Sequence, residues 1–122
     1  MSTRMNPDIK AQWIAALRSG QYRQGRGRLR RRTPEGDQYC CMGVLCELAV
    51  QDGVIPPATC CSDIYEYAGT VGYPPLSVQA WSGLESDNGP YHVGSTPHSL
   101  TGDNDSKQQT FDEIASIIDQ RF

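Results

Sequence analysis

The sequence contains no long apolar run. None of its segments approaches the roughly 20 consecutive apolar residues that a membrane-spanning helix needs, which excludes an integral helical membrane protein. The segment 1–10 also lacks the apolar core of a secretory signal peptide. We therefore expect no membrane partner and a cytoplasmic site of action, where cysteines stay reduced.

Hydrophobic residues are few, at 38% of the 122 residues, whereas glycine and proline occur 12 and 8 times. A chain of this length can build one hydrophobic core and not two. The two tryptophans and six tyrosines argue against disorder. We expect a loop-rich single domain over residues 1–122 of the α+β class, in which two or three helices pack on a short antiparallel sheet.

Helices are predicted near both ends of the chain. The first begins after Asn6, a good N-cap, and ends at Gly20, a typical residue after a helix terminus. The last begins with a capping box formed by Thr110 and Glu113. A further short helix is expected over 77–81.

The segment 41–52 predicts a buried central helix, because it is apolar on almost every face. Gly43 lies inside it and costs about 1 kcal/mol relative to alanine. Its presence therefore predicts close packing of a neighbouring element, and Leu45 should lie in the core.

The remaining segments predict short strands and turns. Strong turn chemistry at 33–37 separates two strands that we expect to pair. The expected strands are 28–31, 38–40, 64–67, 70–73 and 91–93, and further turns are expected at 87–90 and 103–105.

The cysteines form two vicinal pairs and one single residue: Cys40, Cys41, Cys46, Cys60 and Cys61. Vicinal cysteines rarely form a disulfide, because its Cα atoms lie about 5.5–6 Å apart and a trans peptide holds them at about 3.8 Å. Zinc sites favour two cysteines with two to four residues between them in turn geometry, and this set offers no such pair at a turn. We expect no metal and no cofactor, and thiols that pack as small apolar groups.

The signals for catalysis are weak. A cysteine could pair with His92 or His98, but apolar surroundings raise the pKa of a thiol and make it inert. Asp63, Glu66 and Glu85 lie in no motif that distinguishes catalytic carboxylates from solvated ones. We expect no catalytic residue and do not expect an enzyme.

Charge is distributed unevenly. The segment 1–32 holds nine of the eleven basic residues and a single acid, whereas 33–122 holds two basic residues and thirteen acids. Six arginines lie between positions 23 and 32. Such a run contacts nucleic acid, phosphate or the acidic part of its own fold, and both the functional and the structural interpretation stay open.

Phosphate binding is the best hypothesis at the level of residues. The segment 24–28 combines flexible glycines with guanidinium groups, which match phosphate geometry. It is neither a Walker loop nor a dinucleotide fingerprint. Two tyrosines flank the run and could stack a base, or they could simply pack. The candidate ligand-binding residues are Tyr22, Gln24, Arg26, Arg28, Arg30 and Tyr39.

Three segments together resemble a family of small proteins encoded by tailed bacteriophages and prophages. They are WIAALRSGQYRQ at 13–24, YCCMGVLCELA at 39–49 and TFDEIASII at 110–118. The family's short V-x-x-W-x-G-L segment and its N-D pair resemble 78–84 and 104–105. The resemblance implies a phage origin and action in the host cytoplasm, and it provides no catalytic residue.

This sequence departs from the family pattern at Met42, where leucine is usual, and in an expanded arginine run at 28–32. By analogy with small phage proteins, we expect a non-enzymatic binding protein that sequesters an anionic ligand, with a nucleotide immune signal as the first candidate. The alternatives are an inhibitor that docks on a host protein and a nucleic-acid-binding module that uses the arginine run. We also expect a homo-oligomer, because so short a chain alone forms only a shallow pocket.

Overall fold

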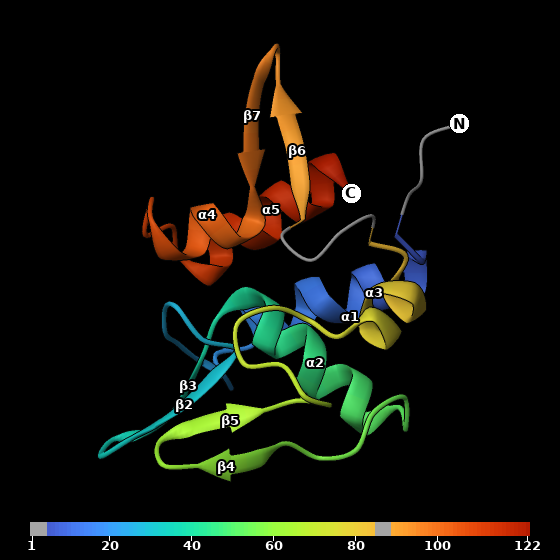
Figure 1. Cartoon of the computed structure of the whole chain (residues 1–122). Helices are drawn as coiled ribbons and strands as arrows, with labels where there is room; N and C mark the ends of the chain where they lie inside the picture. The colour runs from blue at the N-terminus through green and yellow to red at the C-terminus, as the bar shows by residue number, and fades with distance from the viewer. Residues whose placement is uncertain (1–4, 85–88) are drawn as a thin grey trace.

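A computed structural model of the chain describes residues 5–84 and 89–122 (Figure 1). Within these ranges it describes every side chain except that of Cys61. Its helices are α1 (Pro7–Arg18), α2 (Cys41–Gln51), α3 (Leu76–Ser82), α4 (Leu100–Asp105) and α5 (Phe111–Arg121). Its strands are β1 (Arg23–Gln24), β2 (Arg30–Thr33), β3 (Gly36–Tyr39), β4 (Thr59–Cys61), β5 (Ile64–Glu66), β6 (Pro90–Val93) and β7 (Thr96–Ser99).

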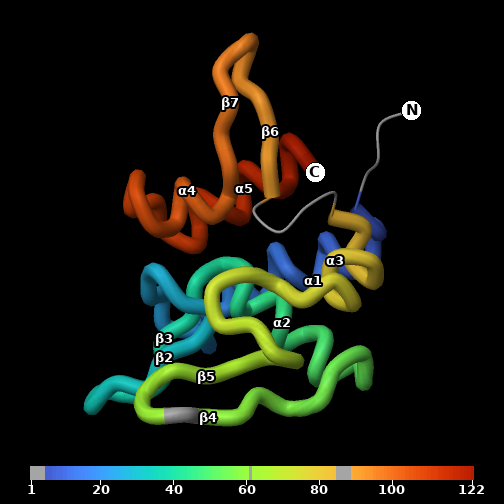
Figure 2. Tube along the Cα trace, in the orientation of Figure 1, coloured from blue at the N-terminus to red at the C-terminus, as the bar shows by residue number. Residues whose placement is uncertain are grey.

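The expected α+β class is confirmed. The described residues form five helices rather than two or three, together with a five-stranded sheet of order β1-β3-β2-β5-β4. This sheet is mixed rather than antiparallel, because β1 pairs with β3 in parallel. The strands β6 and β7 form a separate hairpin that projects away from the rest of the molecule in both views (Figures 1 and 2).

Helix α1 begins and packs as its sequence predicts. The side chain of Asn6 accepts hydrogen bonds from the backbone of Asp8 at 2.9 Å and Ile9 at 3.5 Å. Ile9 and Trp13 are buried on the apolar face of this helix. The indole of Trp13 donates to the carbonyl of Cys41 at 2.9 Å, so α1 is attached directly to the start of α2.

Helix α2 is the centre of the core. Leu45 is fully buried within it, as expected. A Cβ atom built on Gly43 would lie 1.7 Å from the carbonyl oxygen of Leu29, which confirms the expected close approach. The chain between β1 and β2 therefore lies against the backbone of α2, and only glycine leaves room for it.

The observed strands differ from the expected ones where backbone groups find other partners. The strand expected at 28–31 begins only at Arg30, because Leu29 is buried, donates to the carbonyl of Val71 at 2.8 Å and accepts from Cys40 at 3.2 Å. The expected strand at 70–73 is wrong, since only an isolated bridge joins Tyr67 to Thr70.

The expected turn at 103–105 is also wrong, because these residues belong to α4. The side chain of Ser99 caps this helix by accepting from the backbone of Gly102 at 3.0 Å. The expected turn at 87–90 begins outside the described residues. The expected capping box is confirmed, with Thr110 and Glu113 hydrogen-bonded in both directions at the start of α5.

In the described part of the chain, no helix has both the length and the apolar character needed to cross a bilayer.

Candidate anion-binding surface

Residues 25–28, which lie between β1 and the buried Leu29, are hereafter called the arginine loop. Gln24 precedes it and contacts the C-terminal part of the chain. Its amide donates to Asn104 Oδ1 at 2.9 Å and to the carbonyl of Gln109 at 2.7 Å, and its Oε1 accepts from the backbone of Phe111 at 3.1 Å. Gln24 therefore joins β1 to α4 and α5, and its hydrogen-bonding groups are engaged internally rather than exposed to a ligand.

Asn104 fixes the arginine loop from beneath. Its side chain is fully buried, donates to the carbonyl of Gly25 at 2.9 Å and to Asp105 Oδ1 at 2.8 Å, and accepts from the backbone of Cys41 at 3.3 Å. Asp105 Oδ1 in turn accepts from the backbone N–H of Gly27 at 3.0 Å. Sequence reasoning assigned no role to Asn104; the N-D pair of the phage pattern was the available signal.

Arg30 lies inside an ion-pair network. Its guanidinium donates to Asp37 at 2.6 and 3.0 Å and contacts Glu47 at 3.3 Å. The hydroxyl of Tyr67, which is fully buried, donates to the same oxygen of Glu47 at 2.5 Å. Two carboxylates therefore neutralise this predicted ligand-binding arginine within the fold.

The charge of Arg30 is nevertheless retained. Burial opposes it, but the hydrogen bonds to Asp37 and Tyr67 and the electrostatic effect of Tyr39 together raise the pKa of its guanidinium above the ordinary value. Burial and the hydrogen bond to Glu47 likewise raise the pKa of Tyr67. Arg30 and Tyr67 therefore both keep their protons across the ordinary pH range.

The two tyrosines predicted to stack a base are half-buried and already in contact with neighbours. The rings of Tyr22 and Tyr39 pack edge to face with centroids 5.1 Å apart. The guanidinium of Arg30 lies 5.1 Å from the centroid of Tyr39 and 4.1 Å from that of Tyr65. Burial raises the pKa of Tyr39 to about 12. Both rings therefore contribute to a packed row across the sheet.

Arg26 and Arg28 remain at the surface. Both side chains are exposed, and the guanidinium of Arg28 donates to the carbonyl of Gly27 at 2.8 Å. Exposed arginines also lie on either side of the loop, at Arg23 and Arg31. Within residues 5–84 and 89–122, no carboxylate forms an ion pair with any of these four side chains.

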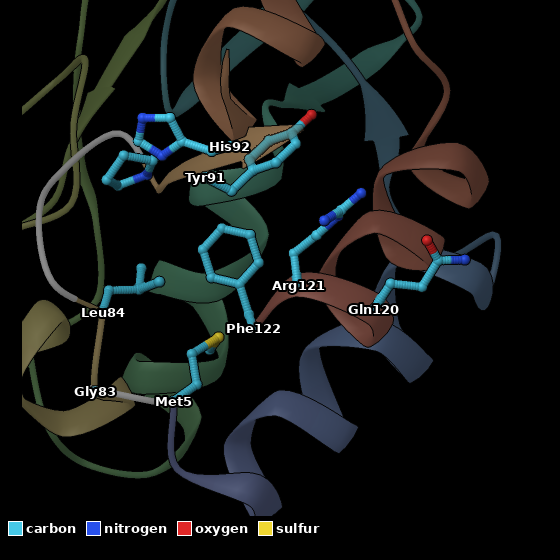
Figure 3. Close-up of a pocket in the computed structure, with 9 residues that line it drawn as sticks. Met5, Gly83, Leu84, Tyr91, His92, Gln120, Arg121 and Phe122 are labelled. Atoms are coloured by element: carbon cyan, nitrogen blue, oxygen red, sulfur yellow. The ribbon is translucent and has the colours of Figure 1, made fainter. Parts of the chain in front are cut away.

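Three of the cavities formed by the described residues lie elsewhere, and none of these three is lined by the six candidate residues. One of about 370 Å³ lies at the base of the β6–β7 hairpin, where the ring of Phe122 lies between Tyr91 and Met5 (Figure 3). A second, of about 420 Å³, borders His98 and Lys107. A third, of about 600 Å³, follows the exposed side of α1.

The base of the hairpin is attached to α4 by a buried acid. The hydroxyl of Tyr91 donates to Asp103, whose other oxygen pairs with Lys107 at 3.2 Å. Burial and this hydrogen bond raise the pKa of Tyr91. Lys107 also contacts His98, which stacks on Tyr91 with ring centroids 5.3 Å apart. Asp103 and Lys107 therefore pair with each other within the protein.

The thiols are inert where they are buried. Burial raises the pKa of Cys40 to about 11 and those of Cys41 and Cys46 well above their usual value. Cys60 departs from the expectation, because it is exposed on β4, an edge strand of the sheet. No group of three or more potential metal ligands occurs in the part of the chain that the structure describes.

Comparison with known proteins assigns a family. A family model described as "Domain of unknown function (DUF8296)" matches residues 5–122. The chain belongs to the DUF8296 family. No curated protein and no solved structure matches it. The DUF8296 match includes both the arginine loop and the residues of α4 that hold it, so the two parts of this surface belong to one family domain.

Proposed function

We propose that this DUF8296 chain is a phage-encoded, non-enzymatic binding protein that captures a phosphate-bearing ligand at its arginine loop. The leading candidate is a nucleotide immune signal of the host. One observation carries the proposal: the exposed guanidinium groups of Arg26 and Arg28 lack ion-pair partners among the described residues, while the neighbouring backbone of Gly25 and Gly27 is held by Asn104 and Asp105.

Fixed backbone geometry supports this proposal. A ligand that binds an already ordered loop does not have to order it, so more of the interaction energy appears as affinity. Arginine presents a planar fork of donors that matches two phosphate oxygens. Asp105 partly offsets the positive potential, but its Oδ1 already accepts from Gly27 and Asn104.

Capture of a small nucleotide also requires enclosure. The arginine loop lies outside the three cavities described above, so we propose that a second copy of the chain closes the site. The phage origin and the host cytoplasm as the site of action rest on the sequence resemblance.

Nucleic acid is the second candidate, and the openness of the surface favours it. Arg23 and Arg31 extend the positive charge to either side of the loop, and an extended polyanion needs no enclosing pocket. Phosphate contacts of this kind release counterions, so the affinity for nucleic acid should fall steeply with salt. Enclosed nucleotide binding should depend on salt much less.

The test uses the purified full chain with a panel of cyclic and linear nucleotides. The protein is incubated, filtered and heat-denatured, and the released ligand is identified by chromatography. We expect intact ligand from wild type and none from the double variant Arg26→Glu/Arg28→Glu, because each change replaces attraction by repulsion. Altered ligand would indicate an enzyme instead.

A matched control places the same charge change elsewhere. Lys10→Glu/Arg121→Glu alters net charge equally on α1 and α5, and it should bind as wild type does. Thermal melting of both double variants checks the fold. If wild type binds no nucleotide and no oligonucleotide, the proposal is wrong, and docking on a host protein becomes the hypothesis to pursue.

A further inference from the structure

Residues 71–76 present three large apolar side chains to solvent. Val71 is 39% exposed, Tyr73 51% and Leu76 80%. Scattered single apolar residues at a surface are ordinary, but three lie here within six residues, and this segment is hereafter called the apolar ridge. The ridge includes an aromatic ring, which is the group that stacks an unpaired nucleobase.

This apolar ridge lies beside the arginine loop. The backbone N–H of Leu29 donates to the carbonyl of Val71 at 2.8 Å, so Arg28 is one residue from the contact and Tyr73 is two. Two residues of extended chain span at most about 7 Å, so the backbone of Tyr73 lies no farther than that from the backbone of Val71. Figure 1 shows the segment between β5 and α3 on the same side of the molecule as the loop between β1 and β2.

The ridge is held in place by its prolines. Pro74 and Pro75 are buried, and the side chain of Gln79 donates to the carbonyl of Pro74 at 2.9 Å. The backbone of Val78 and of Gln79 donates to the carbonyl of Pro75 at 3.0 and 3.1 Å. Tyr73 therefore projects from a fixed backbone, and stacking on it does not require a loop to become ordered.

Tyr73 differs in this respect from the tyrosines that the sequence suggested. Tyr22 and Tyr39 are half-buried, and each ring packs on the other. A base could stack on either of them only after displacing a side chain of the protein. Tyr73 presents half of its surface to solvent and needs no such displacement.

We propose that Tyr73 is the base-stacking residue of this site, and that the ligand therefore joins a phosphate to an unpaired nucleobase. This inference rests on the proposed function of the arginine loop. A free nucleotide and a single-stranded nucleic acid share this chemistry. A duplex does not, because its bases are stacked on one another.

Fluorescence anisotropy of the full chain tests the proposal with three labelled probes: a dT12 single strand, an abasic strand of the same length and a 12-base-pair duplex. Tyr73→Ala should weaken binding of dT12 by about tenfold and leave the abasic strand unchanged. Tyr73→Phe keeps the ring and should bind as wild type does. Leu76→Ser removes exposed apolar area without a ring and is the matched control, with wild-type binding expected.

A second arm identifies the source of the ligand. If wild type retains cyclic di-AMP, cyclic di-GMP or AMP after filtration but does not bind dT12, then Tyr73→Ala should lower the amount of nucleotide retained by about tenfold, with Tyr73→Phe again as wild type. Either pattern supports base stacking, by a free nucleotide or by a single strand.

Two outcomes would overturn the inference and leave the function standing. In the first, Tyr73→Ala binds every base-containing probe as wild type does, while Arg26→Glu/Arg28→Glu binds none. In the second, Tyr73→Ala weakens the abasic strand as much as dT12, which means that the ring does not contact a base. If wild type binds no probe at all, the proposed function itself fails.

Discussion

Arg30 and the pair Arg26 and Arg28 lie within five residues of one another, yet the fold places them in opposite environments. Arg30 is surrounded by two carboxylates and two aromatic rings. Arg26 and Arg28 face solvent on the arginine loop. Hydrogen bonds from the rest of the protein hold the backbone of this loop and leave the two arginine side chains unpaired by carboxylates among the described residues. A run of like charges is therefore not one functional unit, because one of its members is a structural cation.

Leu29 separates the two environments. It is fully buried, and α2 passes directly over its carbonyl at Gly43. The chain before Leu29 is a surface loop, and the chain after it is a strand in the sheet. A substitution that shifts Leu29 should therefore alter the surroundings of Arg30 and also the arginine loop. A substitution within only one of these two regions should leave the other intact.

Gly43→Ala should have the largest effect on stability, because it displaces Leu29, the residue that separates the arginine loop from β2. The added Cβ would lie 1.7 Å from the carbonyl oxygen of Leu29, and a backbone atom cannot move away as a flexible side chain can. We expect a loss of at least about 4 kcal/mol in the free energy of unfolding, or no folded protein. Urea denaturation measures it, and a loss below about 1 kcal/mol would contradict the observed helix packing.

Asn104→Ala should come next, and it tests the support of the exposed arginines. The change leaves the backbone groups of Gly25 and Cys41 without their buried partner, which should cost about 3 kcal/mol. Amide hydrogen exchange at Gly27 should also become faster, because Asp105 loses its contact with Asn104. Unchanged exchange would mean that the arginine loop is ordered by something else.

High pH should destabilise the core of the protein, in which the thiol of Cys40 is buried. Burial raises the pKa of Cys40 to about 11 in the folded protein, against about 9 for an exposed thiol. A raised pKa contributes stability that is present below about pH 9 and is lost as the pH rises through about 11. From this thiol we expect a loss of about 2–3 kcal/mol, measured by urea denaturation at pH 8 and pH 11. Cys40→Ala should lose less over the same interval, and an identical pH dependence in both proteins would refute the assignment.

Arg30→Gln and Arg28→Gln compare the two environments directly. Arg30→Gln removes the partner of two partly buried carboxylates and should cost about 2 kcal/mol. Arg28→Gln changes an exposed side chain and should alter stability by no more than about 0.5 kcal/mol. Equal effects in chemical denaturation would show that the distinction between the two arginines is wrong.

The local parts of the fold could be predicted because their signals are local. Asn6, Gly20 and the capping box at Thr110 are near the observed ends of α1 and α5. Helix α4 was missed, since Asp103, Asn104 and Asp105 favour turns in isolation. They form a helix here because Ser99 caps it and because Asn104 finds buried partners that are distant in sequence.

The candidate site could be predicted only in part. The sequence locates the run of glycines and arginines, and the structure leaves Arg26 and Arg28 exposed in it. It cannot tell that Arg30 is neutralised, because Glu47 reaches it from another element. The role that we propose for Tyr73 could not be predicted either, because its closeness to the loop depends on the contact between Leu29 and Val71.

The residues that hydrogen-bond to the arginine loop and to Gln24 are synthesised after the loop itself. A chain is synthesised from its N-terminus at about 5–20 residues per second. Gly27 and Gln24 receive their partners from Asp105 and Asn104, which follow them by 78 and 80 residues. The arginines therefore exist for several seconds before the side chains that shape their loop have been made. A chain that ended before Asn104 would keep every arginine of the run and lose the geometry that makes it a surface.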